Sequence, residues 1–102
     1  MRYVYPGSKE SLITLQSQYG NYINGEFTPP VNGTWFTNTS PVNGSVIGDF
    51  PRSDKDDVEK ALDAAHAAAD AWGKTSVQSR SLTLLKIADR LEQNLEMLAV
   101  NE

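Results

Sequence analysis

The stretch from Ser53 to Trp72 constrains the fold more than any other part of the chain. Ser53 is a predicted N-cap, and Asp56 follows where a capping box places its second acceptor. Gly73 can adopt the left-handed conformation that closes a helix. The apolar positions recur every three or four residues and form one helical face: Val58, Ala61, Leu62, Ala65, Ala68, Ala69 and Trp72. The pattern predicts an amphipathic helix whose alanine-rich face a neighbouring backbone can approach closely.

A second amphipathic helix is predicted after a short link, with Ser76 as its N-cap. Its apolar face consists of Leu84, Leu85, Ala88, Leu91, Leu95, Leu98 and Ala99. No glycine or proline interrupts this pattern, so one continuous helix is expected up to the end of the sequence. The short link favours an antiparallel helix pair over residues 53–102. A sequence that stops inside an element is typical of a fragment.

The first half of the chain predicts short β-hairpins over residues 19–50. Asn24-Gly25 is typical of a type I′ turn and joins Tyr22-Ile23 to Glu26-Phe27. Pro29-Pro30 ends the second strand. Further turns at Asn32-Gly33 and from Pro41 to Gly44 flank predicted strands at 34–39 and 45–50.

Residues 1–18 are expected to form an arm with a turn at Pro6-Gly7. Ser11 to Gln18 fits either a helical turn or a short strand. The predicted fold class is therefore an α+β segment, with an arm at 1–18, β-hairpins at 19–50 and the helix pair at 53–102.

Composition excludes several classes of function. The net charge of −4 argues against nucleic acid or an anionic membrane as a partner. The absence of cysteine excludes a disulfide framework, a thiolate zinc site and a cysteine nucleophile within these 102 residues. No signal peptide and no apolar run of membrane-spanning length is visible, so a soluble cytoplasmic protein is expected.

Candidate ligand-binding side chains each have a simpler structural interpretation. His66 is the single histidine and has no second histidine or cysteine to share a metal with, so a structural role is favoured. Asp54, Asp56 and Asp57 resemble the start of a calcium loop, but Glu59 occupies the position that requires glycine. Negative charge at the positive end of a helix dipole explains these aspartates.

Two further patterns point to turns and packing. The sequons at Asn32, Asn38 and Asn43 lie where turn chemistry is expected. Seven aromatic residues lack an interleaved basic patch, so they are predicted to pack within the arm and hairpins and not to stack on bases: Tyr3, Tyr5, Tyr19, Tyr22, Phe27, Trp35 and Phe36. No nucleophile–base pair and no glycine-rich phosphate loop can be assembled.

Several blocks, taken in order, resemble the N-terminal segment of the NAD(P)-dependent aldehyde dehydrogenase superfamily. They are Tyr22 to Phe27, Ser40 to Ile47 with serine in place of the usual asparagine, Asp57-Val58 to Trp72, and Arg80 to Glu102. The resemblance covers residues 19–102. The opening residues, the stretch from Ala64 to Trp72 and that from Glu92 to Glu96 are most similar to the bacterial acetaldehyde dehydrogenase branch.

The resemblance implies a part of an α/β Rossmann-like coenzyme-binding domain in a homo-oligomeric enzyme that uses NAD or NADP. Such enzymes oxidise aldehydes to acids with a cysteine nucleophile and a glutamate base, and both lie downstream of the matched region. No catalytic, coenzyme-binding or metal-binding residue is therefore assigned to this chain. Some members bind a structural cation at the position matching Asn38 and Thr39, helped by an acidic residue past Glu102, which this sequence does not contain.

The first hypothesis is an N-terminal fragment of an aldehyde dehydrogenase that is inactive alone and whose partner is the remainder of the enzyme. Its exposed apolar helix faces predict self-association or a partly molten state in isolation. The competing hypothesis is a stand-alone helical hairpin that binds a partner protein through the same faces. A third is a remnant of an enzyme without function.

Overall fold

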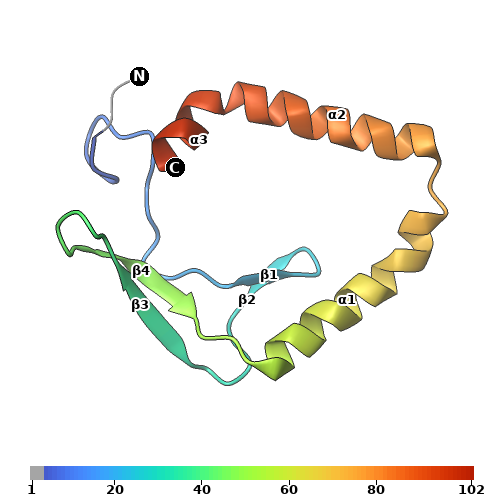
Figure 1. Ribbon diagram of the computed structural model, residues 1–102, viewed down its shortest axis with the longest axis horizontal. Helices are drawn as coiled ribbons and strands as arrows, with labels where there is room; N and C mark the ends of the chain where they lie inside the picture. Colours follow the sequence, from blue (N-terminus) through green and yellow to red (C-terminus); the bar gives the residue numbers. More distant parts are fainter. Residues whose placement is uncertain (1–3) are drawn as a thin grey trace. The chain divides into compact units, whose positions relative to one another are not determined.

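The computed structural model describes residues 4–102, so the predicted packing residue Tyr3 lies outside the described residues. The elements are β1 (Asn21–Ile23), β2 (Glu26–Thr28), β3 (Trp35–Thr39), β4 (Val46–Pro51), α1 (Lys55–Gly73), α2 (Val77–Gln93) and α3 (Leu95–Asn101) (Figure 1). The chain forms two units. One spans Gln16–Trp72, and the other combines the described residues before Gln16 with Gly73–Glu102. The expected α+β class, with short antiparallel strand pairs followed by helices, is confirmed.

The predicted type I′ hairpin is present. β1 pairs antiparallel with β2, and Ile23 lies opposite Glu26 across the turn. Asn24 and Gly25 have φ angles of 54° and 80°, the left-handed values that this turn requires at both central positions. The rings of Tyr22 and Phe27 lie on one face of the pair, with centroids 4.9 Å apart. The hairpin thus follows from the local chemistry of two residues.

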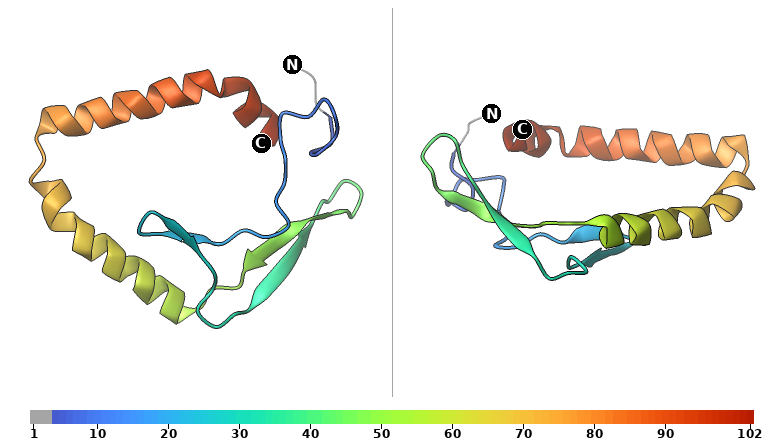
Figure 2. Two further views of the ribbon diagram at one scale, coloured as in Figure 1. Left: turned by 180° about the vertical axis from the view of Figure 1, so that it is seen from behind. Right: turned by 60° about the horizontal axis from the view of Figure 1, so that its bottom comes forward.

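The second hairpin pairs β3 with β4, from Trp35 opposite Pro51 to Thr39 opposite Val46, with a bulge between Asn38 and Thr39. Figure 2 shows the same two strands side by side from two further directions. Their connecting turn is closed by a hydrogen bond from the Gly44 amide to the Ser40 carbonyl, 2.8 Å long. The predicted strands at 34–39 and 45–50 are therefore confirmed to within a residue or two at each end.

The arm ends alongside β4. The Tyr19 amide donates to the Asp49 carbonyl, and the Asp49 amide donates to the Ser17 carbonyl, both at 2.9 Å. Gln18 forms a single parallel bridge to Asp49. Neither the helical turn nor the short strand considered for residues 11–18 forms, and this bridge is the one ladder contact assigned there. The turn predicted at Pro6-Gly7 is present, since the Ser8 amide donates to the Tyr5 carbonyl at 3.1 Å.

A row of stacked rings covers one face of the second hairpin. Tyr19 lies parallel to Phe50 with a centroid distance of 5.2 Å, and Phe50 lies 5.9 Å from Phe36. The Arg52 guanidinium lies 5.4 Å from the centre of the Phe36 ring, within the range of a cation–π contact. Four of the predicted packing aromatics thus have a ring partner: Tyr19 and Phe36 contact Phe50, and Tyr22 contacts Phe27.

The start of α1 differs from the prediction by one residue. Asp54, not Ser53, caps the helix, because its Oδ1 accepts from the amides of Asp56 at 3.0 Å and Asp57 at 3.5 Å. Asp57 completes the reciprocal box by accepting from the Asp54 amide at 3.1 Å. The hydroxyl of Ser53 instead accepts a 2.7 Å hydrogen bond from Asn21. A contact with a residue distant in the sequence therefore removes Ser53 from the cap.

The end of α1 also differs. Gly73 is the last residue of the helix and is not among the glycines with positive φ, so the predicted left-handed closure is wrong. The N-cap of α2 is confirmed, because the Ser76 hydroxyl accepts from the Ser79 amide at 3.0 Å.

The second predicted helix is interrupted at Asn94, which separates α2 from α3. The Asn94 side chain donates to the Arg90 carbonyl at 2.8 Å and its backbone amide reaches the carbonyls of Arg90 and Leu91, at φ −116° and ψ 19°. A short amide side chain that bonds the preceding turn competes with regular helix continuation. The antiparallel arrangement of α1 and α2 stays a prediction.

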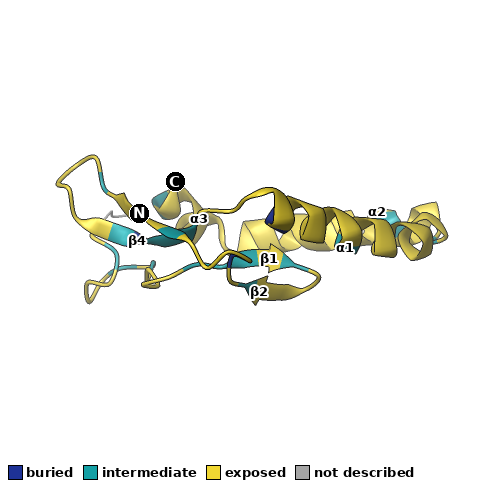
Figure 3. Cartoon of the chain, turned by 90° about the horizontal axis from the view of Figure 1, so that it is seen from below, coloured by how far each residue is buried: buried dark blue, intermediate teal, exposed yellow. Residues whose placement is uncertain are grey.

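Little of the described chain is buried. Among residues 4–102 only Pro30, Gly48 and Asp57 are fully buried, and no large hydrophobic side chain is. Figure 3 shows α1 and α2 coloured almost entirely as exposed. Leu62 of α1 is 48% exposed and Leu84 of α2 is 67% exposed, although both belong to the predicted apolar faces. No helix in the described part of the chain is long and apolar enough to cross a bilayer.

Candidate functional site

The buried carboxylate of Asp57 fastens the loop after β2 to the start of α1. Asp57 is 4% exposed, and its Oδ1 accepts from the Val31 amide at 2.9 Å while Oδ2 accepts from the Asp54 amide. These bonds, first that from Val31, hold the pKa of Asp57 below its usual value because they stabilise the charged form. Asn32 adds a 3.1 Å bond from its Nδ2 to Oδ2 of Asp54.

The aspartates considered for calcium therefore serve the helix start. Oδ1 of Asp54 and both oxygens of Asp57 accept from backbone amides, and Oδ2 of Asp54 accepts from the Asn32 side chain. Asp56 lies exposed in the first turn of α1. Residues 4–102 contain no cluster of three or more histidine, aspartate or glutamate side chains that could hold a metal ion. His66 is exposed on α1. Asn38 and Thr39, which match the position where some members of the resembled family bind a cation, are exposed at the bulge between β3 and β4.

The sequon asparagines lie on the surface, but the prediction of turn chemistry is wrong for Asn38, which lies in strand β3 and pairs with Gly48. Asn32, Asn38 and Asn43 are all exposed. The side-chain oxygen of Asn32 accepts from the Thr34 amide at 2.9 Å, and that of Asn43 accepts from the Ser45 amide at 3.0 Å. These two are turns of the kind that asparagine side chains stabilise.

The alanine face of α1 lies beside the first hairpin. Ala61, Ala64, Ala65 and Ala68 line a hollow of about 350 Å³ together with Tyr22, Ile23, Asn24 and Gly25. Because alanine side chains are short, the hairpin backbone can approach this part of the helix. The hollow contains no ionisable side chain other than the Tyr22 phenol, so it offers space and apolar contact without chemistry.

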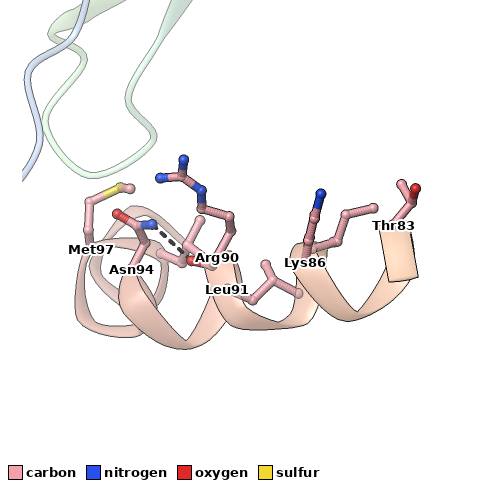
Figure 4. A pocket seen from close by; sticks show the side chains of 8 residues that line it. Thr83, Lys86, Arg90, Leu91, Asn94 and Met97 are labelled. Atoms are coloured by element: carbon pink, nitrogen blue, oxygen red, sulfur yellow. Dashed lines mark hydrogen bonds between the residues drawn. The ribbon is translucent and has the colours of Figure 1, made fainter. Parts of the chain in front are cut away.

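A second hollow of about 440 Å³ follows α2 into α3. Figure 4 shows Lys86, Arg90 and Met97 projecting to the same side of this segment. Ile87, Leu91 and Leu98 supply the apolar part of the lining. We call this surface the α2–α3 groove; it is lined by Thr83, Lys86, Ile87, Arg90, Leu91, Asn94, Met97 and Leu98.

The α2–α3 groove is suited to contact with another protein surface. Its apolar side chains stay accessible, with Leu91 at 53% and Leu98 at 39%, and Lys86 and Arg90 add two cations to its lining. Sequence periodicity singled out Leu91 and Leu98 but missed Lys86, Arg90 and Met97. The signal that could have found the groove is Asn94, whose side chain favours a break between two apolar runs.

The chain is similar to known proteins along most or all of its length. The family model described as "Aldehyde dehydrogenase family" matches residues 27–102. An acetaldehyde dehydrogenase of Pseudomonas aeruginosa is 67% identical over 102 residues, which is all of this chain and 20% of the relative. An aldehyde dehydrogenase of Deinococcus radiodurans is 58% identical over 100 residues, covering 98% of this chain and 19% of the relative.

A solved structure gives the same result in three dimensions. The crystal structure of an NAD-dependent aldehyde dehydrogenase from Sinorhizobium meliloti matches with a TM-score of 0.75 at 32% sequence identity. The match covers 96% of this chain and 20% of that one. The chain thus spans about one fifth of the length of the curated relatives and of the solved structure that it matches.

Proposed function

This chain belongs to the aldehyde dehydrogenase family, and we propose that residues 1–102 act as the N-terminal part of the coenzyme-binding domain of an enzyme that oxidises an aldehyde to a carboxylic acid. The proposal rests on 67% identity to an acetaldehyde dehydrogenase along the whole chain. It makes acetaldehyde the first substrate to test and NAD the first coenzyme, since the matched solved structure is that of an NAD-dependent enzyme.

The role of this segment is to pack against the remainder of the enzyme. The chain exposes 8234 Å². Two compact bodies of about 5.6 kDa, each half of the mass, would together expose about 6,900 Å² by the usual scaling of surface with mass. The excess of about 1,300 Å² is larger than the roughly 800 Å² that one partner contributes to a standard protein interface. This excess of total surface, together with the exposed apolar side chains of α1 and α2, supports a structural part that is completed by further protein.

We place the dinucleotide site outside this segment, and the hydrogen bonds at the starts of α1 and α2 support this. The amides at the start of α1 are taken by the carboxylates of Asp54 and Asp57, and Ser76 caps α2. A pyrophosphate needs such amides free, usually behind a glycine-rich turn. The chain also has no cysteine to supply a thiolate. Binding of the coenzyme and attack on the aldehyde therefore fall to residues outside positions 1–102.

The same surfaces predict the behaviour of the isolated chain. We propose that it self-associates through the apolar faces of its helices, because monomers rarely leave contiguous apolar patches of this extent in water. The full enzyme is proposed to be a cytoplasmic homo-oligomer.

Fragment complementation tests the proposed function. The 102-residue chain is combined with a Pseudomonas aeruginosa acetaldehyde dehydrogenase that lacks the matched segment, and NADH formation from acetaldehyde is followed. We expect turnover only when both pieces are present. Leu91→Asp in the α2–α3 groove should abolish assembly, whereas Gln93→Asp on another face of α2 should not.

Two outcomes would contradict the proposal. Turnover by the 102-residue chain alone would show that it carries chemistry of its own. A chain that stays monomeric, unfolds in one sharp transition and does not bind the truncated dehydrogenase would favour the stand-alone interaction module.

A further inference from the structure

The chain contains three Asn-Gly pairs, and the structure places all three asparagines on the surface: Asn24, Asn32 and Asn43. Asparagine followed by glycine is prone to loss of its side-chain amide, because a residue without a Cβ leaves its backbone nitrogen open to approach. Exposure does not distinguish the three. Their hydrogen bonds do, and we propose that Asn24 is a site of spontaneous deamidation at the tip of the β1–β2 hairpin.

The reaction needs only water and a base. The Gly25 backbone nitrogen gives up its proton and attacks Cγ of Asn24, and the side-chain nitrogen takes up protons from water and leaves as ammonia. The resulting five-membered imide then adds water at one of its two carbonyls. Opening at one carbonyl gives aspartate and at the other gives isoaspartate, so the net change is water consumed and ammonia released.

Both reacting groups at the hairpin tip are free. Within residues 4–102, neither the amide of Gly25 nor the side chain of Asn24 has a hydrogen-bond partner. The turn residues have left-handed φ angles and must rotate before the ring can close. That rotation is cheap here, because β1 and β2 each contain three residues and an isolated two-stranded hairpin is marginal in water.

At Asn32, both groups that would react are held by hydrogen bonds. The Gly33 amide, which would be the nucleophile, donates to the Pro30 carbonyl at 3.0 Å. The side chain of Asn32 accepts from the Thr34 amide at 2.9 Å and donates to the Asp54 carboxylate at 3.1 Å. Closing the ring therefore requires these bonds to break first.

Asn43 is protected in the same way. The Gly44 amide donates to the Ser40 carbonyl at 2.8 Å, and the side-chain oxygen of Asn43 accepts from the Ser45 amide at 3.0 Å. Breaking three hydrogen bonds at Asn32 and two at Asn43 before reaction should slow each of them at least about tenfold relative to Asn24.

The modification changes the hairpin as well as its charge. The net charge goes from −4 to −5 at pH 7, because one neutral amide is replaced by one carboxylate. Isoaspartate also inserts an extra carbon into the backbone of a two-residue turn, and this disrupts the register that places Ile23 opposite Glu26. The tip lines the hollow against α1, so the altered hairpin loses its fit to the alanine face.

Mass spectrometry after ageing the purified chain in mildly alkaline buffer tests the proposal. Chymotrypsin places each Asn-Gly pair on a separate peptide, 23–27, 28–35 and 37–50. Each peptide reports its own deamidation by the mass gained when NH₂ becomes OH. Electron-transfer fragmentation then distinguishes aspartate from isoaspartate. A parallel sample in concentrated urea removes the native hydrogen bonds, and Asn24→Ser removes the proposed site alone.

We expect peptide 23–27 to deamidate at least about tenfold faster than the other two in buffer and the three rates to converge in urea. Asn24→Ser should eliminate the fast phase and leave the slow ones unchanged. Equal rates in buffer, or Asn32 or Asn43 reacting first, would overturn the proposal. A preference for Asn24 that persists unchanged in urea would also overturn it, because the difference would then come from local sequence and not from the hydrogen bonds.

Discussion

Replacing Gly73 by alanine tests how α1 ends. A glycine after an apolar helix predicts left-handed closure, whereas the structure includes Gly73 in α1 without a positive φ. A Cβ added there meets no atom within 4 Å. An added Cβ therefore neither clashes with nor packs against other atoms. The backbone conformation alone decides whether the substitution raises or lowers stability.

The two conformations predict opposite signs. Alanine is more favourable than glycine inside a helix by roughly 0.5–1 kcal/mol, and we expect about 0.5 kcal/mol at the last residue. In a left-handed conformation the same Cβ would cost roughly 1–2 kcal/mol. Gly33→Ala is a matched control, because a Cβ at Gly33 also meets nothing within 4 Å but its φ is +70°. It should destabilise its turn by that larger amount.

Hydrogen–deuterium exchange measures both effects locally, which avoids assuming a single unfolding transition. Gly73→Ala should slow exchange in the last turn of α1 about twofold, the factor that corresponds to about 0.5 kcal/mol. Gly33→Ala should speed exchange in the turn that precedes β3. Faster exchange in α1 after Gly73→Ala, of the size seen with Gly33→Ala, would refute the helical end of α1.

Three other perturbations have defined outcomes. Ser76→Ala removes the acceptor that lies 3.0 Å from the Ser79 amide, so exchange in the first turn of α2 should rise by the equivalent of about 1 kcal/mol. Gly48→Ala places a Cβ 3.0 Å from the Gln16 carbonyl oxygen, and NMR should show the arm displaced from β4 at a cost of roughly 1–3 kcal/mol. The folded-state pKa of Asp57 is lowered from 3.8, so ionised Asp57 stabilises the folded chain above pH 3.8. This stabilisation is lost as the pH falls through the folded-state pKa, and Asp57→Asn should remove this acid step from a circular dichroism titration.

Features set by adjacent residues were predictable from the sequence. Asn24-Gly25 determines a two-residue turn through its own φ preferences, and the hairpin forms with the expected partners. Ser76 caps α2 because its acceptor lies three residues from the amide that it satisfies. The apolar faces of the helices were also recognisable, since they depend only on spacing.

Features that depend on distant contacts were not predictable. Ser53 has the right chemistry for an N-cap, but its hydroxyl is bonded to Asn21 and the cap moves to Asp54. The Asp57 carboxylate gains a further role from the Val31 amide, a contact between a loop and a helix start. Neither partner can be identified from residues near the cap.

Asn94 explains why the α2–α3 groove could not be predicted from periodicity. Leu91, Leu95 and Leu98 follow helical spacing, so the pattern treats them as one stripe on a continuous helix. The side chain of Asn94 bonds to the Arg90 carbonyl and ends α2, so α3 begins in a new direction that spacing cannot give. Periodicity identifies which apolar side chains need a partner surface, whereas the break at Asn94 determines the shape that this surface must have. The partner of this groove must therefore fit the corner at Asn94, and a straight helical face is not sufficient.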